Sequence, residues 1–107
     1  MDRKELIANL KMFKKEIRKK YNITKLILFG SYATGKIKEH SDVDLIIVGE
    51  FKEKGNINRA PLLYHEWHLV QKIDLPVDFL CYTPEEFKKL SKQITIVGEA
   101  LKEGIVI

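Results

Sequence analysis

Three aspartates and a glycine-serine turn are the residues of this sequence whose types and spacing could do chemistry. The turn, Gly30-Ser31, ends an apolar run, and after ten intervening residues Asp42 and Asp44 open a second apolar run, DVDLIIV. Asp78 lies inside a third apolar run, LPVDFLCY, where an unpaired acid is costly to bury. We therefore expect these residues to form a site.

The two acids of the DVD run have a spacing that suits a metal ion. Asp42 and Asp44 are two residues apart in a predicted strand, so both carboxylates point to the same side of it. Like charges that close raise each other's pKa unless a cation lies between them. Magnesium commonly takes one or two carboxylates from a protein and completes its shell with water and substrate phosphates. If the second and third strands are neighbours, Asp78 joins the pair, and the cluster predicts two Mg²⁺ ions at the spacing of phosphoryl transfer.

The turn before the acids adds groups that suit a phosphate. Gly30 lets the main chain approach a ligand closely, and Ser31 offers its hydroxyl and nearby N–H groups. Each residue alone has a structural explanation, with Ser31 as a helix cap and Asp42 as a turn residue. The turn and three acids together favour a phosphate and magnesium site.

Apolar periodicity predicts the elements that position these residues. An amphipathic helix is expected through residues 6–21, with a lysine-rich solvent side. Strands are expected at residues 24–30, 42–48 and 75–82. Gly35 is expected to end a helix or turn between the first two strands.

The second half of the chain is predicted to alternate loop, helix and strand. Residues 49–58 are expected to form a mobile loop, and Pro61 to begin a helix that runs to about residue 73. The buried stripe of that helix is predicted to be Leu63, Trp67 and Val70.

After the third strand, Thr83 is expected to cap a helix that starts at Pro84, with Glu86 completing a capping box. Apolar positions that include Ile94 continue this pattern as one or two helices up to Gly104. The order helix, strand, strand, helix, strand, helix predicts an α/β (α+β) fold with a small mixed β-sheet covered by helices. Residues 1–107 are expected to be a single domain.

Composition and charge narrow the function classes. The chain has 107 residues, 45% hydrophobic and 32% charged, with no signal-peptide core or membrane-span length, so a cytoplasmic protein without a membrane partner is expected. The formal charge of +4 is concentrated in residues 11–20, which is consistent with a solvated face, an acidic partner or a phosphate-rich substrate. Cys81 is expected to be a buried thiol, and His65 and His68 in HEWH are expected on the surface, since their spacing differs from the HExxH of metalloproteases.

The motif Gly30-Ser31, ten residues, Asp42-Val43-Asp44 resembles the GS-x10-DxD signature of the DNA polymerase β-like nucleotidyltransferase superfamily. The short chain, with Asp78 as third acid, is most similar to the minimal nucleotidyltransferase, or MNT, group. The resemblance implies that Gly30 and Ser31 hold the terminal phosphates of the nucleotide, that Asp42 and Asp44 bind magnesium, and that Asp78 binds the metal nearest the attacking hydroxyl and helps to deprotonate it.

The same resemblance implies a substrate and a partner. Minimal members pair with a helical HEPN protein, as an antitoxin that moves AMP from ATP to a tyrosine of this toxic ribonuclease. Many members carry arginine where this chain has Thr34, and Lys36 and Lys38 are the nearby cations that could replace it. A nucleotide-binding module with a catalytically weak site, which neutralises a partner by contact, stays open as the alternative.

A third interpretation is nucleotide addition to an RNA end or a small molecule, which the basic first helix keeps open. Related enzymes for those acceptors add further domains, so a nucleic-acid partner is not expected.

Overall fold

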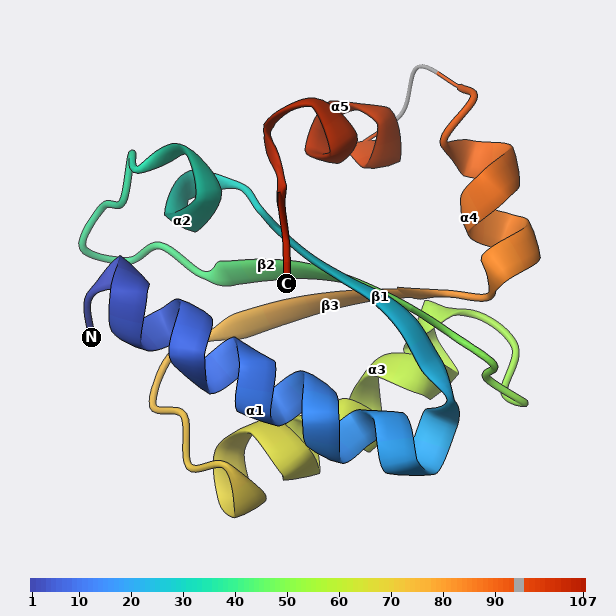
Figure 1. Cartoon of the computed structure of the whole chain (residues 1–107), viewed down its shortest axis with the longest axis horizontal. Coiled ribbons are helices and arrows are strands. Elements are labelled where there is room, and N and C mark those ends of the chain that lie inside the picture. The colour runs from blue at the N-terminus through green and yellow to red at the C-terminus, as the bar shows by residue number, and fades with distance from the viewer. Residues whose placement is uncertain (94–95) are drawn as a thin grey trace.

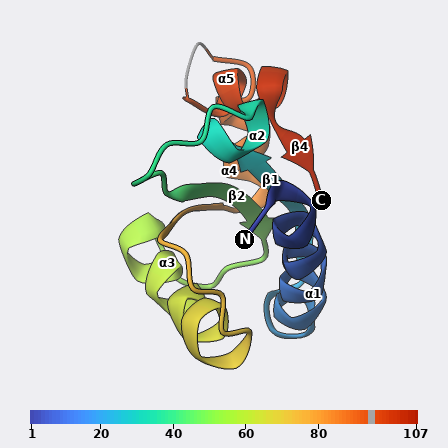
Figure 2. The ribbon, with the colours of Figure 1, turned by 90° about the vertical axis from the view of Figure 1, so that its left-hand side faces the viewer.

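A four-stranded mixed sheet crosses the molecule, and helices cover both of its faces (Figure 1). The computed structural model describes residues 1–93 and 96–107. The helices α1 (Arg3–Tyr21) and α3 (Asn56–His65) lie on one face (Figure 2). The other face is covered by α2 (Ser31–Thr34), α4 (Pro84–Leu90) and α5 (Ile96–Glu103). The predicted fold class, a small mixed sheet covered by helices, is confirmed.

The strands are β1 (Ile23–Phe29), β2 (Val43–Gly49), β3 (Val77–Tyr82) and β4 (Ile105–Val106), in the order β3-β2-β1-β4. β1 runs antiparallel to β2 and β4, whereas β2 and β3 are parallel. The first three strands lie within two residues of their predicted bounds. β4 was not predicted, because two residues are too few to show alternation.

The first helix, α1 (Arg3–Tyr21), follows its apolar periodicity. Asp2 caps it by accepting a hydrogen bond from the Glu5 N–H at 2.8 Å. Its buried stripe packs on the sheet and consists of Leu6, Leu10, Phe13 and Ile17. The cationic residues face away from that stripe, as predicted.

The next helix begins earlier than predicted. α3 (Asn56–His65) starts five residues before Pro61, which lies inside it, so both the loop at residues 49–58 and the helix start at Pro61 were wrong in part. Side chains of the first turns anchor α3 to the outer edge of β3. The amide of Asn56 donates to Phe79 O at 2.8 Å and accepts from Cys81 N at 2.7 Å, and Arg59 donates to Cys81 O at 3.1 Å.

The continuation of α3 is a π-helix, η1 (Glu66–Val70). Leu63 and Trp67 are buried as predicted, but Val70 is 50% exposed. A π-helix has more residues per turn than an α-helix, which moves the position three residues after Trp67 off the buried side. The prediction for Val70 was therefore wrong. His65 and His68 are exposed, in agreement with the prediction.

The C-terminal helices are α4 (Pro84–Leu90) and α5 (Ile96–Glu103), and Gly104 follows α5 directly. Thr83 and Glu86 form the predicted capping box. The predicted apolar position Ile94 lies outside the described residues.

A larger core packs under α1 and α3, with Trp67 in edge contact with Phe13 at 5.2 Å and with Phe79 at 5.8 Å between ring centroids. A smaller core on the other face consists of Ile27, Ile46, Val48 and Phe87. Cys81 is buried as predicted, and burial raises its pKa to about 12. Within the described residues, no helix is long and apolar enough to cross a membrane.

Candidate active site

The predicted acids meet where β1 ends and where β2 and β3 begin. Asp44 lies opposite Phe29 of β1 and opposite Asp78 of β3, so the three residues form a row across the sheet. Asp42 comes directly before β2, two residues from Asp44. The condition set by the sequence, that the second and third strands are neighbours, is met.

The two strand acids point away from the larger core. Val43 and Val77, which precede them, are buried in that core, and side chains alternate along a strand. Asp44 is half-buried, whereas Asp42 and Asp78 are exposed. The acids therefore lie on the sheet face that α2, α4 and α5 cover in part.

The electrostatics of the site are those of crowded carboxylates. The pKa of Asp44 is raised, first by burial and then by the negative charges of Asp78 and Asp42. A cation between these groups would remove the repulsion, so the donor set suits a hard cation such as magnesium.

The protein side chains alone do not complete the coordination shell of a metal ion. Among the residues that the structure describes, no three acidic, histidine or cysteine side chains are arranged to hold a metal ion by themselves. Magnesium needs only one or two carboxylates when substrate oxygens and water supply the rest of its shell. The row of Asp44 and Asp78 fits that mode of binding.

The main chain of the turn approaches the Asp44 carboxylate closely at Gly30. Its φ is +73°, a backbone region that L side chains rarely adopt, and a Cβ at this position would collide with Oδ2 of Asp44. Glycine is therefore required both by the backbone conformation and by the approach of the chain to the carboxylate.

Ser31 opens α2 (Ser31–Thr34), a single helical turn that Tyr32 and Ala33 fix by burial. The carbonyl of Gly30 accepts hydrogen bonds from Ala33 N and Thr34 N, both at 3.1 Å. Gly35 ends the turn with φ +83°, as predicted. The turn thus fixes Ser31 directly after Gly30, the residue that lies against Asp44.

The Thr34 side chain offers no positive charge to this turn. It is exposed, and its hydroxyl donates to Ser31 O at 3.5 Å. Lys36 and Lys38 are exposed in the segment that follows. An arginine does reach the turn from elsewhere, because Arg3 donates from Nη2 to Ala33 O at 2.7 Å.

A hollow of 320 Å³ beside the acids contains residues that sequence reasoning missed. Asp44, Asp78 and Tyr64 line it, together with Phe29, Asn56, Ala60, Phe79 and Leu80. The hydroxyl of Tyr64 donates to Val77 O at 3.3 Å, and burial together with the charge of Asp78 raises the Tyr64 pKa. Tyr64 carries no local signal, because it reaches the site only through the packing of α3 on β3.

Comparison with known proteins identifies the family of this chain. A family model described as "Nucleotidyltransferase domain" matches residues 10–103. A "putative protein adenylyltransferase" of Methanocaldococcus jannaschii is 32% identical over 97 residues, which cover 87% of this chain and 95% of the relative. The protein adenylyltransferase MntA of Thermococcus cleftensis is 39% identical over 49 residues, covering 46% of this chain and 48% of the relative.

Several other curated relatives share shorter segments, and the chain spans about half of their length, between 43% and 55%. Among solved structures, a crystal structure described as a putative nucleotidyltransferase from Sulfolobus solfataricus superposes with a TM-score of 0.59. It covers 97% of this chain and 80% of that chain at 18% identity, which is a likeness of fold. The chain thus belongs to the nucleotidyltransferase domain family, as a minimal nucleotidyltransferase of the DNA polymerase β-like superfamily.

Proposed function

We propose that this chain transfers AMP from ATP to a hydroxyl group in a magnesium-dependent reaction. The observation that carries the proposal is the row of Asp44 and Asp78 across two parallel strands, with Gly30 in contact with Asp44. Membership of the nucleotidyltransferase family supports the same reaction class.

The residues divide the work of an in-line displacement. The acceptor oxygen attacks the α-phosphorus of ATP, a new P–O bond forms, and the bond to pyrophosphate breaks. Asp42, Asp44 and Asp78 would hold magnesium, which supplies charge neutralisation at the phosphates when bound. Gly30 and Ser31 would bind the terminal phosphates, and Asp78 would accept the proton of the acceptor hydroxyl.

The acceptor we propose is a tyrosine of a protein, specifically of a HEPN-type helical toxin for which this chain serves as antitoxin. The names of the relatives, among them a protein adenylyltransferase MntA, support a protein acceptor. The HEPN partner rests on the resemblance of the motif to the MNT group.

The test combines this chain, ATP, magnesium and the purified product of the adjacent gene. We expect that product to gain the mass of one or more adenylates, and peptide mapping to assign them to tyrosine. Asp42→Asn with Asp44→Asn should abolish the gain. An unmodified acceptor in the presence of a folded wild-type chain would reject the proposed acceptor, and adduct formation by the double variant would reject the mechanism.

Thr34 favours a second candidate, a nucleotide-binding module that neutralises its partner by contact. Its exposed hydroxyl cannot replace the charge of an arginine at a triphosphate. In this case the adjacent-gene product would form a stable complex with both the wild-type chain and the double variant and would keep its original mass.

A further inference from the structure

The positive charge of this protein is collected on one helix. α1 holds eight lysine and arginine residues against two glutamates, a charge of +6, whereas the whole chain carries +4. The rest of the chain is therefore net negative, at −2. Such a separation of charge creates a positive field along α1 that is stronger than the net charge of the whole chain suggests.

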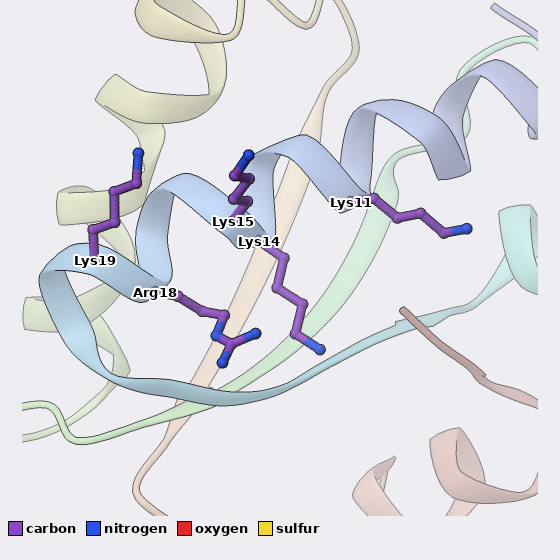
Figure 3. Close-up of a pocket in the computed structure, with 5 residues that line it drawn as sticks. All are labelled: Lys11, Lys14, Lys15, Arg18 and Lys19. Carbon is purple, nitrogen blue, oxygen red and sulfur yellow. The ribbon is translucent and has the colours of Figure 1, made fainter.

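Seven of the eight cations of α1 line two adjoining hollows, whereas Lys20 pairs with Glu66 of η1 at 3.7 Å. Five of them line a hollow of 340 Å³ on the helix, namely Lys11, Lys14, Lys15, Arg18 and Lys19 (Figure 3). Lys11 also borders a second hollow, which Arg3 and Lys4 line with Ile7 and Ala8. We name this surface, from Lys4 to Lys19, the α1 stripe, and at 1.5 Å per residue it is about 22 Å long.

Few acids neutralise the stripe. Lys19 pairs with Glu16 at 3.2 Å, and Lys14 donates to the main-chain oxygen of Ile107 at 2.7 Å. Within the described part of the chain, Lys11, Lys15 and Arg18 have no hydrogen-bond or ion-pair partner. Like charges spaced four residues apart on a helix repel each other, so this arrangement costs stability unless an anion binds.

The composition of the central hollow of the stripe indicates which kind of anion it suits. The central hollow is lined by cations alone, without the aromatic and apolar anchors that hold a protein partner, and lysine is depleted at protein interfaces. It also lacks the aromatic side chains on which single-stranded bases stack. A row of lysines is instead typical of contacts to the phosphates of a duplex.

We propose that the α1 stripe binds the phosphodiester backbone of a double-stranded nucleic acid without reading its sequence. This inference does not depend on the transfer reaction, because no residue of the stripe belongs to the candidate site. It departs from the expectation, drawn from chain length, that nucleic acid is not a partner. The hydrogen bond from Arg3 to Ala33 places the N-terminal end of α1 next to α2, so a bound duplex would extend away from the candidate site along α1.

The test measures binding of the wild-type chain to labelled RNA and DNA duplexes of about 20 base pairs by fluorescence anisotropy. We expect a Kd on the order of 10 µM at physiological salt. With four to five phosphate contacts, the slope of log K against log salt should be about −4, a loss of roughly 250-fold between about 50 mM and about 200 mM salt. Binding of either duplex supports the proposal, and tighter binding of one of them shows whether the stripe suits RNA or DNA.

The variant Lys11→Glu, Lys15→Glu, Arg18→Glu should weaken binding at least about 100-fold at low salt, and removing each phosphate-binding cation should make the salt slope shallower by about 1. The matched control reverses three exposed lysines elsewhere, Lys52→Glu, Lys54→Glu and Lys92→Glu, with the same change in net charge. Circular dichroism checks that both variants keep their helix content.

Lys11→Arg with Lys15→Arg keeps the charge and should keep the binding. Equal losses of affinity in the stripe variant and the control variant would overturn the proposal, because net charge alone would then explain binding. A duplex affinity that does not change with salt concentration would also overturn the proposal. Tighter binding to poly-L-glutamate than to either duplex would overturn it as well, because it would identify an acidic protein as the partner.

Discussion

At the scale of single residues, Asp44 is an acid of the candidate site that folding places in an unfavourable environment. Its pKa is raised in the folded state from an ordinary value of 3.8, so the folded protein binds that proton more tightly than the unfolded chain does. Stability therefore falls as pH rises through 3.8 and remains lower above the folded pKa.

We predict that Asp44→Asn raises the melting temperature at about pH 7 by a few °C and has little effect at about pH 3, where both forms are neutral. Calorimetry at the two pH values measures this. The exposed Asp74→Asn serves as the control and should change neither value. A lower melting temperature of Asp44→Asn at neutral pH would mean that the carboxylate stabilises the fold.

The same crowding predicts how the protein responds to metal. Magnesium with ATP should raise the melting temperature of the wild-type chain, because a ligand that binds only the folded state stabilises it. The Asp42→Asn, Asp44→Asn variant loses the carboxylates that would hold the ion, so its melting temperature should not respond to magnesium. An equal shift in both proteins would place the ion elsewhere.

Gly30 offers a test of the turn that does not use the reaction. Gly30→Ala should destabilise the fold more than Gly35→Ala, although both positions have positive φ, at +73° and +83°. A Cβ at residue 35 meets no atom within 4 Å and costs only the backbone strain, about 1 kcal/mol.

Residue 30 also has a ψ of −155°, a backbone region that is essentially confined to glycine, and its Cβ would meet the Asp44 carboxylate, for a further cost of about 1 to 3 kcal/mol. Urea denaturation of the two variants gives the difference. Equal costs would show that the turn has room beside Asp44.

At the scale of elements, α3 closes the outer edge of β3. An edge strand exposes main-chain groups to other chains, and here side chains of Asn56, Arg59 and Tyr64 bind those groups. Arg59 also forms an ion pair with Glu86 of the capping box of α4. Its buried guanidinium therefore connects α3, β3 and α4.

We predict that Asn56→Ala lowers the free energy of unfolding by about 2 kcal/mol, because Phe79 O and Cys81 N lose their partner at once. Asn58→Ala is the matched control. Its amide donates only to Lys54 O in an exposed loop, so the change should stay within about 0.5 kcal/mol. Urea unfolding separates the two, and hydrogen exchange at Cys81 N–H should rise only in Asn56→Ala. Similar costs would mean that solvent satisfies the edge of β3.

At the scale of the whole molecule, local patterns predicted the first three strands, the amphipathic first helix and the capping box, because each depends on residues close in sequence. The start of α3 could not be predicted, since Asn56 is held by Phe79, 23 residues away. The same holds for Tyr64, which reaches the acids through packing alone. The placement of Asp44 beside Asp78 needed only that two apolar strands be neighbours, whereas the roles of these acids stay predictions.

The charge separation of the molecule leads to a last prediction. Lys15 lies four residues from both Lys11 and Lys19, so it contributes two repulsive pairs at this spacing to α1. Lys15→Glu converts both into attractive pairs, which should raise the free energy of unfolding by about 1 kcal/mol. Added salt should stabilise the wild-type chain and have a smaller effect on this variant, because it screens the repulsion. Lys52→Glu, which changes a lysine outside α1, should leave stability and its salt dependence unchanged. If Lys15→Glu instead destabilises the protein, the α1 stripe stabilises the fold. If Lys15→Glu stabilises the protein and weakens duplex binding, the lysines of the stripe destabilise the free protein and serve to bind an anion.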